Sequence, residues 1–186
     1  QSILNIATAT GLAMAPVAAA EPAVDGRREV NDFVLGAATV VMMHEVGHML
    51  IDELDLPVLG RDEDAADTIA SLVMLNQEGD DEQRGLDYLH ALATTWFLYA
   101  EDDEFEEISD ARMADEHSLS RQRAFTIVCM MHGSEQTLYD DIAERYGLEE
   151  RRQERCETEY QKAESSFLRL IANHLLIEGR EQTSSY

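Results

Sequence analysis

Apolar residues recur at helical spacing through nearly the whole chain, and no stretch shows the alternation that is typical of a half-buried strand. Breaks in this pattern are few, because only three prolines occur in 186 residues. The pattern predicts helices over residues 29–54, 62–75, 86–99, 118–131, 135–146 and 149–177, with an acidic loop over 101–107 and a helix break at Gly133 and Ser134. We therefore expect a mainly α fold, a compact helical domain with little or no sheet.

The first twenty residues form a separate segment. Residues 1–20 contain no charged side chain and end in Ala18, Ala19 and Ala20, which is typical of the back half of a secretory signal peptide. A buried helix and an uncleaved membrane anchor are the alternatives. We expect residues 1–20 to be a signal-peptide remnant and residues 21–186 to form one periplasmic or secreted domain, with no later membrane-spanning segment.

The charge balance excludes several classes of partner. Asp and Glu total 38 against 14 Lys and Arg, which gives a net charge of −24. Such a chain repels the phosphates of nucleic acid and an anionic membrane surface. In so acidic a chain, Arg121 and Arg123 are expected to form salt bridges rather than to bind a substrate carboxylate.

Export also bears on the two cysteines, Cys129 and Cys156. In an oxidising compartment we expect them to form a disulfide, the alternative being two buried free thiols. They are too far apart in sequence for a Cys-x-x-Cys motif, so nothing indicates a redox site.

Residues 44–48 read His-Glu-Val-Gly-His and lie within the long first predicted helix. Four residues advance an α-helix by just over one turn, so His44 and His48 project from one face and can bind one zinc ion. Glu45 lies one position further round, where its carboxylate can accept a proton from the attacking water. The alternative is that the two histidines bind no metal. Buried imidazoles on so apolar a helix face would then need other hydrogen-bond partners. We expect one zinc ion per chain.

A catalytic zinc site needs a third protein ligand, and acidic side chains follow the loop after this motif. Glu63 lies at the start of the second predicted helix. Pro57 and Gly60 interrupt the helical pattern before it, which allows the second helix to fold back onto the first. We predict Glu63 as the third ligand, with Asp64 and Asp67 as rivals, although such acids also favour a helix N-terminus by themselves. Asp67 is expected to accept a hydrogen bond from a ligand imidazole and so fix its tautomer.

The run over residues 44–67, with Asp-Glu-His-Ser-Leu-Ser-Arg-Gln-Arg over residues 115–123, resembles a bacterial metallopeptidase family grouped as domain of unknown function 4344. The resemblance extends from about residue 29 to residue 174. It implies an exported zinc peptidase of the glutamate-zincin type, and the two cysteines match family-like positions. Carried over by position, the ligands are His44, His48 and Glu63, and the base is Glu45.

Hydrolysis also needs a donor that stabilises the oxyanion. His117 is the best candidate, oriented by Asp115 or Glu116. The alternative is that Ser118 caps the following helix and His117 is an ordinary exposed residue. Tyr99 and Tyr139 are the other candidate donors.

The expected function is a zinc-dependent hydrolase that acts on a peptide or protein. A zincin usually carries an edge strand that pairs with an extended substrate, but residues 21–28 leave no room for one. Substrate would then be held by loops and helices or by another chain's edge, or proteolysis would be reduced. A noncatalytic zinc-binding or interaction domain is the alternative function. The sequence leaves the oligomeric state open.

Overall fold

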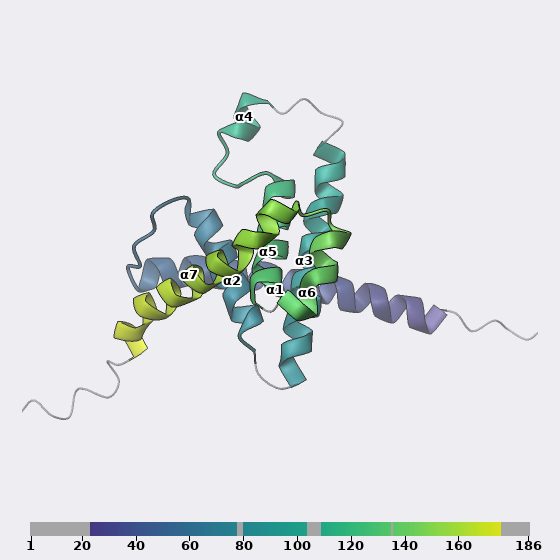
Figure 1. The fold of residues 1–186 in the computed structure, drawn as a ribbon, viewed down its shortest axis with the longest axis horizontal. Coiled ribbons are helices and arrows are strands. Elements are labelled where there is room, and N and C mark those ends of the chain that lie inside the picture. Colours follow the sequence, from purple (N-terminus) through teal and green to yellow (C-terminus); the bar gives the residue numbers. More distant parts are fainter. Residues whose placement is uncertain (1–22, 78–79, 104–108, 135, 176–186) are drawn as a thin grey trace, which may run out of the picture.

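The computed structural model describes residues 23–77, 80–103, 109–134 and 136–175, and it is built from α-helices (Figure 1). The helices are α1 (Ala23–Glu53), α2 (Asp62–Leu75), α3 (Asp80–Asp103), α4 (Asp110–Met113), α5 (Ser120–Ser134), α6 (Gln136–Arg145) and α7 (Glu150–Leu175). No strand occurs in these ranges, so the predicted mainly α fold is confirmed. The predicted signal segment, residues 1–20, lies outside the described residues.

Several helix boundaries differ from the predicted ones. α1 begins at Ala23 rather than at residue 29. α3 runs on to Asp103, so the first three residues of the predicted acidic loop are helical, and residues 104–107 lie outside the described part. α5 ends at Ser134, where a break at Gly133 and Ser134 was predicted, and Gly133 itself is still helical and packs directly against the backbone of α7. A glycine at such a close approach serves packing rather than helix termination.

α5 lies at the centre of the bundle, where it packs against α2, α3, α6 and α7, while α1 packs against α2 and α3. The apolar core lies between these helices. Its fully buried side chains include Val40, Leu89, Ile127, Val128, Met131 and Cys156. A disulfide between Cys129 and Cys156 joins α5 to α7, so the predicted pairing is confirmed.

The two halves of α1 have different surroundings. The carboxy-terminal half packs on its neighbours through Val40, His44 and Ile51, whereas the amino-terminal half extends away from the other helices (Figure 1). Over Gly26–Glu53 the helix is long and apolar enough to cross a bilayer, with a mean hydropathy of 1.5 in its most apolar window. Our expectation that no segment after residue 20 would pass this test is therefore wrong. Length and composition alone do not distinguish a core helix from a membrane span.

Candidate metal centre

Two histidines of α1 and one glutamate of α2 bring their ligand atoms together. His44 Nε2 and His48 Nε2 lie 3.1 Å apart. Glu63 Oε2 lies 3.0 Å from His44 Nε2, and Glu63 Oε1 lies 3.3 Å from His48 Nε2. Ligand atoms about 2.0–2.1 Å from one tetrahedral zinc ion are about 3.3 Å from one another. The three side chains thus have the mutual spacing of three ligands of one ion.

The approach of α2 to α1 depends on a glycine within the motif. A Cβ atom on Gly47 would lie 2.9 Å from Ala66 Cα and 3.0 Å from the Ala66 carbonyl oxygen. The backbones of the two helices therefore meet at this point. The contact holds the first turn of α2, and Glu63 with it, against the histidine face of α1.

Asp67 fixes the orientation of His44. Its Oδ1 accepts a hydrogen bond from His44 Nδ1 at 2.8 Å, and since a carboxylate only accepts, the proton lies on Nδ1 and the Nε2 lone pair faces Glu63 and His48. This hydrogen bond raises the pKa of His44 more than burial lowers it. Asp67 thus lies where the sequence predicted a tautomer-fixing carboxylate.

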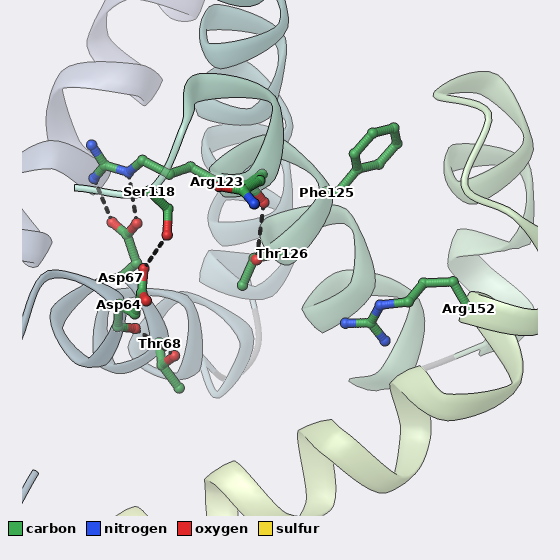
Figure 2. A pocket seen from close by; sticks show the side chains of 9 residues that line it. Asp64, Asp67, Thr68, Ser118, Arg123, Phe125, Thr126 and Arg152 are labelled. Atoms are coloured by element: carbon green, nitrogen blue, oxygen red, sulfur yellow. Dashed lines mark hydrogen bonds and ion pairs between the residues drawn. The ribbon is translucent and has the colours of Figure 1, made fainter. Parts of the chain in front are cut away.

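Arg123 of α5 completes this network (Figure 2). Its Nε and Nη2 donate to the two oxygens of Asp67, each at 2.7 Å, and its guanidinium lies 4.1 Å from the centre of the Trp96 ring. Burial raises the pKa of Asp67, but the hydrogen bonds from His44 and Arg123 outweigh it and hold that pKa below its ordinary value. The carboxylate that orients His44 is therefore charged and held from two sides.

A loop before α5 carries His117 to the same place. His117 Nε2 lies 3.0 Å from Glu63 Oε2, and Asp115 Oδ1 accepts hydrogen bonds from both His117 Nδ1, at 3.1 Å, and the His117 backbone N–H, at 2.9 Å. The next residue, Ser118, donates to Asp64 Oδ1 at 2.7 Å, as Figure 2 shows. Asp64 therefore anchors the loop rather than facing the histidines.

A cavity of about 610 Å³ lies over these side chains, and Glu45 lines it together with His44, His48, Glu63 and His117. Glu45 is exposed to solvent there. The structure thus brings together all five residues that the sequence singled out for metal binding, proton transfer and oxyanion stabilisation. Of the alternative oxyanion donors, Tyr99 packs against Trp96 and does not line this cavity, and the side chain of Tyr139 lies outside the described residues.

The donor set fits a zinc ion. Glu63 Oε2 is buried, yet none of its contacts within the described residues has the geometry of a hydrogen bond. A cation between the imidazoles would satisfy this oxygen. Two neutral imidazole nitrogens and one carboxylate are ligands that catalytic zinc sites use, and they leave a fourth position open. A second group of side chains able to share a cation consists of Glu63 with Glu116 and His117.

Sequence reasoning missed two parts of this site. The contacts of Arg123 with Asp67 and Trp96 join α5, α2 and α3, and only the general expectation of a salt bridge pointed to them. The anchoring of Ser118 by Asp64 was also missed, because it joins residues 54 positions apart. Neither pair has a fixed spacing in sequence that would reveal it.

Comparison with family models gives one match over most of the chain. A family model described as "Putative metallopeptidase", domain of unknown function 4344, matches residues 13–171. No curated protein and no solved structure matches the chain.

Proposed function

The chain belongs to the metallopeptidase family of domain of unknown function 4344, and from that premise we propose that it is an exported, zinc-dependent peptidase of the glutamate-zincin type. The observation that carries the proposal is the spacing of His44 Nε2, His48 Nε2 and the Glu63 carboxylate, all between 3.0 and 3.3 Å. These three side chains would hold one zinc ion per chain. Zinc supplies Lewis acidity, which polarises a carbonyl and makes water a nucleophile at neutral pH.

The protein's own groups divide the remaining work. Glu45 accepts the proton of the attacking water and returns it to the leaving amine, for which its exposed position in the cavity is suited. His117 stabilises the oxyanion. Because Asp115 Oδ1 accepts a hydrogen bond from His117 Nδ1–H, a donor at Nε2 requires the imidazolium form, in which both ring nitrogens carry a proton.

Two features support the rest of the proposal. The Cys129–Cys156 disulfide is typical of an oxidising compartment, which favours export. The described residues form helices and no strand, so they offer no strand edge to an extended peptide. We therefore propose that loops and helices around the cavity hold the substrate, a peptide or a protein.

Metal content and turnover of matched variants test this function. Wild-type protein purified without chelator should contain one zinc per chain, and His44→Ala should lose it, whereas His174→Ala, which changes a histidine of α7 outside the cavity, should keep it. Glu45→Gln should keep the zinc and lose peptide hydrolysis by about 100-fold or more. A wild-type chain without zinc contradicts the metal site. A zinc-loaded chain that hydrolyses no peptide, or a Glu45→Gln variant with full activity, contradicts the peptidase.

A further inference from the structure

A long apolar face of α1 is exposed to solvent. Val30, Val34 and Met49 are 61, 58 and 52 % exposed, although they belong to a helix that otherwise packs on α2 and α3. Scattered apolar side chains on a surface are ordinary, but a contiguous patch marks an interaction site. Following positions three and four residues apart, the face runs through Arg27, Val30, Val34, Ala38, Val41, Glu45, Met49 and Asp52, all of them exposed.

The order of these residues is self-complementary. The steps between them are three, four, four, three, four, four and three residues, which read the same in both directions. An antiparallel copy of the same helix therefore places Arg27 opposite Asp52, Val30 opposite Met49, and Ala38 opposite Val41. Opposite charges meet at both ends, two apolar pairs lie between them, and Val34 lies opposite Glu45, whose carboxylate lines the metal cavity.

We propose that this α1 face binds a second copy of the chain, with the two helices antiparallel about a two-fold axis near residues 38–41. A two-fold interface uses one patch twice and must be complementary to itself, which is the property that Arg27 and Asp52 provide at the two ends of this face. The partner would cover the part of α1 that extends from the bundle in Figure 1.

A membrane is a poorer occupant of this face. The chain carries a net charge of −24, which repels an anionic bilayer surface. A bilayer would also have to bury Asp52 without a partner, whereas a second copy places an arginine opposite it. The α1 helix would have to leave α2 and α3 in order to span, although Val40, His44 and Ile51 are buried against them.

The dimer adds a wall to the metal cavity. Glu45 and Asp52 line that cavity and also belong to the α1 face. In the antiparallel register the partner's Val34 lies opposite Glu45. Each copy would therefore bound the cavity of the other along α1, and a substrate would enter from the side of α2 and the His117 loop.

Sedimentation equilibrium of the full chain at physiological salt tests the proposal. Wild type should be dimeric, with a mass that falls to that of one chain on dilution. Val34→Glu should be monomeric, whereas Leu168→Glu, a similarly exposed change on α7 at 56 %, should dimerise as wild type does. Both positions are exposed in the described structure, so far-UV circular dichroism of the two variants should match that of wild type.

A charge exchange tests the register. Arg27→Asp would place two acids together at each end of the interface and should weaken the dimer about tenfold or more, and the double variant R27D/D52R should restore it. Three results would overturn the proposal: a wild-type monomer at all concentrations, with or without binding to neutral vesicles; a dimer that survives Val34→Glu; or a double variant no tighter than Arg27→Asp. None of these measurements depends on zinc or on peptide hydrolysis.

Discussion

Replacing Asp67 by Asn removes the charge on which both His44 and Arg123 depend. The side chains of Asp67 and Arg123 are 8 and 10 % exposed and are joined by two hydrogen bonds of 2.7 Å. Breaking a buried pair on one side costs about 3–5 kcal/mol. The amide oxygen of Asn still accepts one of the arginine hydrogen bonds, so we expect the lower end, about 3 kcal/mol of the free energy of unfolding.

Urea unfolding of chelator-treated protein, followed by far-UV circular dichroism, measures this loss apart from the metal. Asp141→Asn is the matched control, because Asp141 pairs with Arg145 at 3.0 Å while the two side chains are 67 and 57 % exposed. That exposed pair should contribute less than about 1 kcal/mol. The difference between the two variants isolates burial as the cause.

The pH dependence of the loss has a definite sign. Hydrogen bonds from His44 and Arg123 hold the pKa of Asp67 below its ordinary value despite the opposing effect of burial. The carboxylate therefore stabilises the fold above the pKa of an unfolded aspartate, and this contribution disappears as the pH falls through the lowered pKa. Wild type and Asp67→Asn should thus differ most near neutral pH and converge in acid.

Zinc affinity provides a second readout, because a carboxylate that orients a ligand histidine contributes about 10–100-fold to metal binding. Asp67→Asn should lose affinity in this range, and Asp141→Asn should lose none. If Asp67→Asn unfolds like its control, the buried pair does not stabilise the protein. If its stability falls while zinc affinity stays unchanged, Asp67 supports the helices but does not orient His44.

Three further predictions follow from the packing. Gly47→Ala should destabilise the protein by about 1–3 kcal/mol and weaken zinc binding, because its Cβ would lie 2.9 Å from Ala66 Cα; urea unfolding equal to wild type would contradict this. The double variant C129S/C156S should lose about 3–4 kcal/mol in denaturant unfolding, as expected for cysteines 27 residues apart, and added reductant should not lower its stability further. Burial lowers the pKa of His90 below its ordinary value of 6.5, so the free energy of unfolding should fall as the pH decreases from 6.5 towards this lowered pKa. His90→Gln should remove this pH dependence, and an unchanged pH dependence of unfolding in the variant would refute the prediction.

The fold class and the proximity of His44, His48 and Glu63 were predictable because both depend on local spacing. Helical periodicity placed six helices near their observed positions, and a four-residue step is enough to place His44 and His48 on one face. Glu63 followed from the loop breakers, since a short loop returns the second helix onto the first. The end of α5 near Gly133 was predicted, but the close approach of this glycine to the α7 backbone was not.

The contacts around these ligands were harder to predict. Arg123 reaches Asp67 across 56 residues, and its other contact, Trp96, lies on a third helix. An arginine with many acidic neighbours in sequence gives no indication of which one it binds. Such partners depend on how helices pack side by side, which the periodicity of each helix does not determine.

The three proposed zinc ligands all lie within one helical hairpin, and this bears on the order of folding. His44, His48 and Glu63 span 20 residues, so closing the short loop between α1 and α2 is enough to bring them together, at a small entropic cost. His117 and Arg123 come from more than fifty residues later, and their contacts with α2 form only when the α5 region docks. A metal ion captured by the early hairpin would therefore stabilise a folding intermediate, whereas the groups that orient the site and bind the oxyanion would arrive in the final step.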